Sequence, residues 1–189
     1  MTDESNIEWN RANIWQSEVS MTKALLVIDL QNDYFPDGKF PLWNTEAVLQ
    51  NIERAIEKAN AQGIPVVIVQ HVAKQGLAPF FNEGTAGAEI HPRILAAAPK
   101  APIVVKEFAD SFERTNLEET LTKLGVTELL VCGMMTQNCV THTAISKAAE
   151  KYTVCILVDC CTTVSEILHL IALHAVSTRV KLVPSSEVL

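Results

Sequence analysis

Short apolar segments, rich in Val and Ile, alternate with longer amphipathic segments along most of this chain. The short segments have the length and composition of strands that are buried on both faces of a sheet. They lie at residues 24–30, 64–69, 103–105, 128–132, 154–158 and 180–183. This pattern predicts six buried strands separated by helices.

The first two helices carry start and stop signals. Apolar residues between positions 48 and 59 recur at helical spacing, with Asn44 as the N-cap and Gly63 as the stop signal. A second helix is predicted at about residues 117–124, capped by Asn116 and closed by Gly125.

Two further helices are predicted at about residues 138–151 and 166–176. The latter is apolar on nearly every side, so we expect it to be buried on two faces or to form a subunit interface. Residues 71–102 are irregular and rich in Gly and Pro. They predict a pocket-forming excursion with one short helix near residues 91–98.

Alternation of strands and helices is typical of an α/β protein. We therefore expect a three-layer doubly wound fold, with a six-stranded, mostly parallel sheet and right-handed crossovers. In such a sheet the functional site lies at the carboxyl ends of the strands, where the strand order reverses. One domain is expected over residues 21–189. Residues 1–20 are expected to be an N-terminal extension, docked through Trp9 and Trp15.

Composition narrows the class of partner. The formal net charge of -7 over 189 residues argues against a nucleic-acid partner, which would select an excess of Lys and Arg. No apolar run approaches the roughly 20 residues of a membrane span, and residues 1–20 lack the apolar core of a secretory signal. The five cysteines have neither the number nor the spacing of a disulfide framework or a zinc site. A cytoplasmic protein that acts on a small molecule is the expectation.

Three polar residues stand where strands end. Asp29 replaces an apolar residue at the end of the first strand, and Lys106 follows the third. Cys139 opens a helix after the fourth strand, a position where Thr136 can cap the helix and the free N–H groups lower the pKa of a thiol. Each residue alone also fits a structural role: a hydrogen-bonded strand end, a surface lysine or a buried cysteine. Together they fit nucleophilic catalysis.

The segments around these residues carry a recognisable pattern. Residues 27–35 read Val-Ile-Asp-Leu-Gln-Asn-Asp-Tyr-Phe, Val105-Lys106 is followed by Ser111, Phe112 and Thr115, and residues 133–140 read Gly-Met-Met-Thr-Gln-Asn-Cys-Val. In order and spacing these blocks resemble the isochorismatase-like cysteine hydrolases, over about residues 21–189. The resemblance implies a six-stranded parallel sheet with helices on both faces and a tendency to form homo-oligomers.

The resemblance to this family also implies an Asp-Lys-Cys catalytic triad. Cys139 would attack a carbonyl to form a thioester, Asp29 would move the proton, and Lys106 would balance their charge. The backbone N–H groups of Met135 and Cys139 would hold the oxyanion, beside a cis peptide bond between Met134 and Met135. The implied activity is amidase-like hydrolysis of a C–N bond in a small amide or carbamoyl compound.

The sequence departs from two branches of that family. Nicotinamidases carry Asp-x-His after the second strand, whereas this chain reads Gln70-His71-Val72-Ala73. One histidine is a poor metal site, so neither a metal nor another cofactor is expected. True isochorismatases lack the nucleophilic cysteine. Vinyl-ether cleavage by Asp29 without the thiol remains the alternative enzyme, and a non-catalytic member of the fold is a further one.

A nicotinamide-dependent dehydrogenase is disfavoured, because no G-x-G-x-x-G follows the first strand. The expected substrate pocket is mostly aromatic, which suits a small planar or aliphatic molecule, although each ring could equally be core packing. The candidate lining residues are Tyr34, Phe35, His71, Phe80, Phe81 and Phe108. His91 is expected to begin the short helix.

Overall fold

A six-stranded sheet forms the centre of the protein in a computed structural model, which describes residues 22–74 and 78–189. The strand order is β3-β2-β1-β4-β5-β6, and every neighbouring pair is parallel. The strands are β1 (Lys23–Ile28), β2 (Val66–His71), β3 (Ile103–Lys106), β4 (Glu128–Met134), β5 (Thr153–Thr162) and β6 (Lys181–Val183). The fold prediction is confirmed, and the strand order reverses between β1 and β4.

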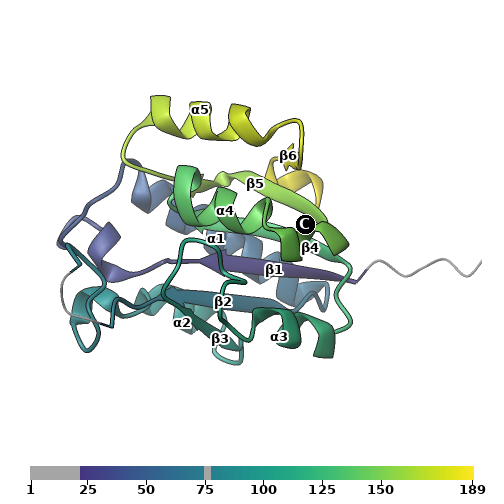
Figure 1. Cartoon of the computed structure of the whole chain (residues 1–189), viewed down its shortest axis with the longest axis horizontal. Helices are drawn as coiled ribbons and strands as arrows, with labels where there is room; N and C mark the ends of the chain where they lie inside the picture. Colours follow the sequence, from purple (N-terminus) through teal and green to yellow (C-terminus); the bar gives the residue numbers. More distant parts are fainter. Residues whose placement is uncertain (1–21, 75–77) are drawn as a thin grey trace, which may run out of the picture.

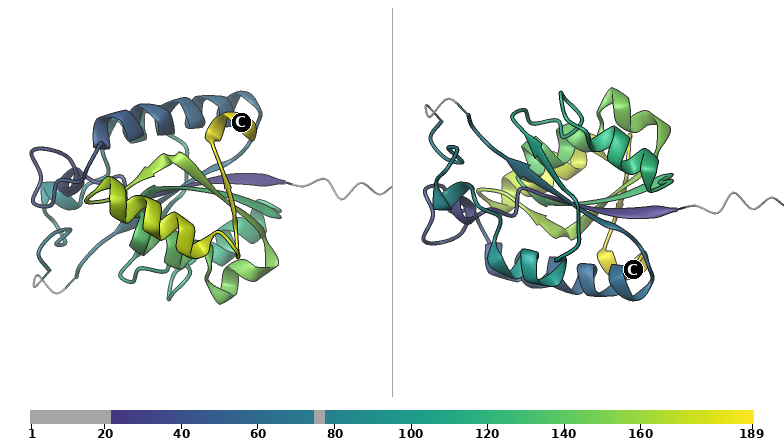
Figure 2. Two further views of the ribbon diagram at one scale, coloured as in Figure 1. Left: turned by 90° about the horizontal axis from the view of Figure 1, so that it is seen from above. Right: turned by 90° about the horizontal axis from the view of Figure 1, so that it is seen from below.

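Helices cover both faces of the sheet (Figures 1 and 2). Helices α1 (Thr45–Ala61) and α2 (Pro92–Ala97) pack on one face. The other face carries α3 (Leu117–Lys123), α4 (Thr141–Ala144) and α5 (Glu166–Val176). Both faces bury apolar side chains, which explains why β1 and β4 are apolar along almost their whole length.

Helix α1 begins and ends close to the predicted residues. Its inner face buries Val48, Leu49, Ile52, Ala55, Ile56 and Ala59. Gly63, at φ 69°, follows the C-terminus. Asn44 and Asn116 occupy the N-cap positions of α1 and α3, but within the described part neither side chain makes a capping bond. The predicted capping chemistry is therefore wrong, although the positions are right.

The single helix predicted at about residues 138–151 is not continuous. A π-helical turn (Thr136–Val140), the single turn of α4 and a 3-10 helix (Lys147–Lys151) take its place. The first two pieces are contiguous, and Cys139 lies in the first of them. The short helix α2 is where it was expected, with His91 as its N-cap: the Nδ1 atom accepts a bond from the Arg93 N–H.

Helix α5 matches its predicted bounds but is not buried on two faces. Ile167, Leu170 and Ile171 are 73%, 58% and 59% exposed. This outer face is the surface that the sequence assigned to a subunit interface.

The predicted extension at residues 1–20, with Trp9 and Trp15, lies outside the described residues. In the described part of the chain, no helix has both the length and the apolar character that a membrane crossing requires.

Candidate active site

Asp29 lies at the end of β1, next to the reversal in strand order. Its N–H donates to the Val69 carbonyl of β2, and its backbone has φ 55°, a conformation that Asp tolerates better than most residues. The neighbouring strand β4 approaches very closely here. A Cβ on Gly133, which has φ 125°, would lie 2.0 Å from the Ile28 carbonyl oxygen. The close approach brings the ends of β1 and β4 together and requires glycine.

Lys106, the last residue of β3, supplies the cation of the site. It is in register with His71 of β2, and its side chain extends across the end of that strand. The Nζ atom lies 2.8 Å from Asp29 Oδ2, 3.2 Å from Cys139 Sγ and 3.1 Å from His71 Nδ1. The ammonium and the Asp29 carboxylate are both inaccessible to solvent. The structure thus brings the three predicted residues into one buried cluster, together with His71.

Cys139 lies in the π-helical turn that follows β4. The Met134–Met135 peptide bond before this turn is cis, as the resemblance implied. Thr136 does not cap the turn, which corrects the expectation: its hydroxyl lies 2.9 Å from Nδ1 of His169 on α5. This contact ties α5 to the turn that carries Cys139.

The electrostatics of the cluster follow from its burial. Burial alone would lower the pKa of Lys106, but Asp29 and Cys139 outweigh it and raise that pKa, so the side chain stays an ammonium. Burial and the negative Asp29 raise the pKa of Cys139, and Lys106 offsets them only in part. The expected lowering of the thiol pKa is therefore wrong. The resting residue is a thiol that needs a base to become nucleophilic.

One atom of Asp29 is suited to act as that base. Oδ2 accepts from Lys106, whereas Oδ1 is buried and has no hydrogen-bond partner within residues 22–74 and 78–189. A buried carboxylate oxygen without a partner is costly, so Oδ1 is free to accept a further hydrogen bond. Ligand-type atoms of Asp29, His71 and Cys139, one of them a carboxylate oxygen of Asp29, lie within 4.8 Å of one another.

The same three side chains offer the donor set of a metal site, one carboxylate, one imidazole and one thiol. The Lys106 ammonium, however, donates to all three of them. A divalent cation there would face a positive charge at about 3 Å in a site of low dielectric constant. The donor set therefore does not fit a resident metal while Lys106 is charged.

Two buried polar residues that the sequence did not single out organise the loops around the cluster. Gln31 donates to the carbonyls of His71 and Ala88 and accepts from the His71 N–H at 2.8 Å. Asp33 accepts from the backbone N–H groups of Lys39 and Phe81. Both lie in the block that starts at Asp29, and a polar residue at every second position was the signal that could have identified them.

The predicted aromatic residues separate into three places. Tyr34, Phe80 and Phe81 form one cluster, in which the Tyr34 and Phe81 ring centroids are 4.5 Å apart. Burial, Asp29 and Cys139 raise the pKa of Tyr34, so this ring lies near the triad and stays a neutral phenol. The ring centroids of His71 and Phe81 are 6.0 Å apart, so His71 also belongs to this cluster.

The other two aromatic residues lie apart. Phe35 packs against His91, with ring centroids 4.3 Å apart. Phe108 is 42% exposed and lies under the Arg114 guanidinium. In the described part, neither ring makes an aromatic contact with His71 or a cation–π contact with Lys106.

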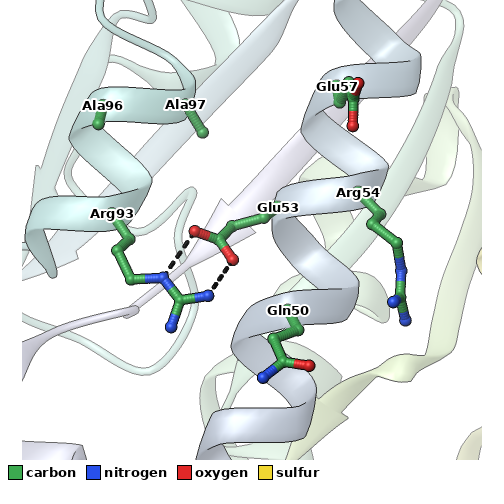
Figure 3. A pocket seen from close by; sticks show the side chains of 7 residues that line it. All are labelled: Gln50, Glu53, Arg54, Glu57, Arg93, Ala96 and Ala97. Carbon is green, nitrogen blue, oxygen red and sulfur yellow. Dashed lines mark hydrogen bonds and ion pairs between the residues drawn. The ribbon is translucent and has the colours of Figure 1, made fainter.

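A groove of about 570 Å³ lies between α1 and α2, on the helical surface of the molecule and not at the strand ends (Figure 3). Across it, Arg93 pairs with Glu53 through two hydrogen bonds and with Glu46 through a third. These ion pairs are solvent-exposed, so they align the two helices and contribute little stability. The groove contains no nucleophile and we assign it no chemistry.

Comparison with known proteins places this geometry in a family. The model of the isochorismatase domain matches residues 23–187. The chain belongs to the isochorismatase family. An uncharacterized family protein of Bacillus subtilis, YddQ, is 41% identical over 76% of this chain and 79% of its own length. Nicotinamidase 3 of Arabidopsis thaliana is 30% identical over 79% of this chain and 78% of its own.

A solved isochorismatase family protein from Desulfovibrio vulgaris superposes with a TM-score of 0.81 at 26% identity, over 88% of this chain and 95% of that one. The match to the family identifies the chain as an isochorismatase-family hydrolase.

Proposed function

We propose that this isochorismatase-family hydrolase cleaves the C–N bond of a small amide or carbamoyl compound through a thioester on Cys139. The observation that carries the proposal is the position of the Lys106 ammonium, 2.8 Å from Asp29 Oδ2 and 3.2 Å from Cys139 Sγ. A cation that contacts both a carboxylate and a thiol stabilises the thiolate as soon as the proton has moved.

The first half of the reaction consumes the thiol proton. Asp29 takes the proton through Oδ1, and the sulfur attacks the carbonyl carbon of the substrate. The resulting oxyanion rests on the N–H groups of Met135 and Cys139 in the turn after β4. When the C–N bond breaks, the proton passes from Asp29 to the departing nitrogen, which leaves as ammonia or an amine.

The second half restores the enzyme. Asp29, again a carboxylate, takes a proton from water as its oxygen attacks the thioester carbonyl. The C–S bond breaks, the acid leaves, and the proton returns to the thiolate. Lys106 keeps its charge throughout and compensates the single negative charge as it moves between Asp29 and Cys139.

The relatives support the amide class. The name of Nicotinamidase 3 assigns that plant protein an amidase activity, and it matches this chain over 79% of the length. This chain lacks the Asp-x-His of nicotinamidases at residues 70–73, so we propose a different amide and a metal-free mechanism.

Vinyl-ether cleavage by Asp29 alone and a non-catalytic scaffold are the competing functions. Intact-protein mass spectrometry after a rapid quench with p-nitrophenyl acetate separates them. We expect an acetyl adduct that maps to Cys139, is absent in Cys139→Ala and persists in the control Cys160→Ala, which removes a buried thiol in β5. Adduct formation in Cys139→Ala equal to wild type would refute the proposed nucleophile.

A further inference from the structure

The contacts of Lys106 determine the protonation of its neighbour His71. A lysine ammonium has three N–H donors and no acceptor. All three have partners here: Asp29 Oδ2, Cys139 Sγ and His71 Nδ1. Because Nζ can only donate, Nδ1 of His71 must accept, and the ring proton of the neutral imidazole must be on Nε2.

The imidazole is neutral in this position. Burial and the adjacent Lys106 lower the pKa of His71, and the weaker effects of Asp29 and Glu107 do not reverse this. The Nε2–H group makes no hydrogen bond to any residue in 22–74 or 78–189, although the ring is only half-buried. His71 therefore presents a donor without a partner among the described residues, on a half-buried ring in a cluster whose other members are buried.

The backbone of His71 is fixed on both sides. Gln31 accepts from its N–H and donates to its carbonyl, each at 2.8 Å, and the strand register places it opposite Lys106. With Lys106 holding the ring as well, the donor is oriented before any ligand arrives. Such preorganisation is typical of groups that bind a substrate in a defined orientation.

The charges in the cluster restrict which substrate groups can bind to that donor. Asp29 and Lys106 cancel, Cys139 is a thiol, and Tyr34 beside them is a neutral phenol because burial and the two acids raise its pKa. Lys106, the only formal cation that contacts the nucleophile among residues 22–74 and 78–189, has no N–H left for a substrate. A carboxylate or an ammonium on the substrate would find no counter-charge among these groups, whereas a neutral oxygen acceptor would find one donor.

The geometry points to His71 as a substrate-positioning residue that donates its Nε2–H to an oxygen acceptor on a neutral amide, next to the carbonyl that Cys139 attacks. This inference rests on the proposed function and deepens it by naming the substrate class. The class consists of uncharged small amides with a second oxygen, such as 2-hydroxy amides, and it excludes their carbon isosteres. A site built around a hydrogen bond rejects an analogue that lacks the partner more strongly than a hydrophobic pocket rejects a change in size.

Lactamide and isobutyramide form a matched pair of probes, because they differ by a hydroxyl in place of a methyl group. We expect the wild-type protein to favour lactamide on the order of 10-fold or more in kcat/KM, the effect of one hydrogen bond to a neutral donor. His71→Phe should bring the preference close to 1, chiefly by raising KM for lactamide. His71→Gln, which retains both an acceptor for Lys106 and an N–H donor, should restore most of it. His174→Gln, on the exposed side of α5, is the control and should behave as wild type.

A purely structural role for His71 would give another result, because loss of Lys106 support would lower kcat for both amides equally and leave their ratio unchanged. That outcome overturns the inference, as does hydrolysis of neither amide by the wild type. Nitrogen-15 NMR of the imidazole tests the tautomer without turnover: a proton on Nδ1 at neutral pH also overturns it. Acetylation of Cys139 by p-nitrophenyl acetate distinguishes these failures from failure of the proposed nucleophile.

Discussion

Replacing Asp29 by Asn removes the negative charge from the buried triad while keeping the shape of the side chain. Lys106 then remains as a buried ammonium whose partners are all neutral. Removing one partner of a buried ion pair typically costs about 3–5 kcal/mol of stability. The ammonium can escape this penalty by losing its proton, and the cost of that deprotonation sets an upper limit on the loss.

The limit follows from the ordinary lysine pKa of 10.5. Deprotonation at pH 7 costs about 1.4 kcal/mol for each of roughly 3.5 pH units, or about 5 kcal/mol. At pH 9.5 the same limit is only about 1.4 kcal/mol. We therefore expect Asp29→Asn to lose about 3–5 kcal/mol at pH 7 and much less at pH 9.5.

The direction of this pH dependence follows from linkage. In the wild type, Asp29 and Cys139 raise the pKa of Lys106, so its favourable contribution is fully present below the unfolded pKa and is lost only as the pH rises through the folded one. In the variant the folded pKa falls below the unfolded value. The loss of stability of Asp29→Asn relative to the wild type is then greatest at low pH and shrinks as the pH approaches 10.5.

Urea unfolding of the wild type and Asp29→Asn at pH 7, 8 and 9.5 measures this difference, with the exposed Asp37→Asn as a control. The control should lie within about 0.5 kcal/mol of the wild type at each pH. A deficit in Asp29→Asn that is constant from pH 7 to 9.5 would show that the uncompensated charge on Lys106 is not its cause.

Three other outcomes are expected. Turnover should be unchanged after EDTA treatment and gel filtration, because the Lys106 ammonium already contacts Asp29, His71 and Cys139, the possible metal ligands. Loss of activity that added zinc restores would contradict this prediction. Sedimentation should show that wild type self-associates and that Leu170→Glu on the exposed face of α5 is monomeric, whereas a monomeric wild type would exclude this interface. In urea unfolding, Gly133→Ala should lose at least about 2 kcal/mol more stability than Gly63→Ala. Both glycines have positive φ, but only at Gly133 would a Cβ clash with the Ile28 carbonyl. Equal losses of stability would contradict the close approach of β1 and β4.

The sheet could be predicted because its signal is local. Each inner strand is a continuous apolar run, and burial on both faces leaves no other pattern for such a run. The C-terminal end of β5 was harder to predict from the sequence. The strand extends to Thr162 through Asp159, Cys160 and Cys161, where the apolar run has ended and pairing with β4 resumes after an irregularity near Gly133. Pairing with a neighbour, which the run itself does not encode, determines that length.

The candidate triad followed from the rule for parallel sheets, whereas its details depend on contacts between distant segments. The sequence indicated one helix that starts at about residue 138, but it could not show the π-helical turn or the contact between Thr136 and His169. Likewise, the sequence placed His71 at a strand end. Its contact with Lys106 depends on the register between β2 and β3, which no local pattern specifies.

The block that begins at Asp29 shows why a buried polar residue is not by itself a catalytic one. Asp29, Gln31 and Asp33 are all buried, yet Gln31 and Asp33 bond to backbone groups of the surrounding loops. Gly87 reflects that role, because a Cβ there would lie 2.1 Å from Oδ1 of Asp33. Asp29 differs: one of its oxygens contacts a side-chain cation, the other has no partner among the described residues, and the carboxylate lies near a thiol. What each side chain bonds to, more than its burial, separates the proposed base from the two residues that build the loops around it.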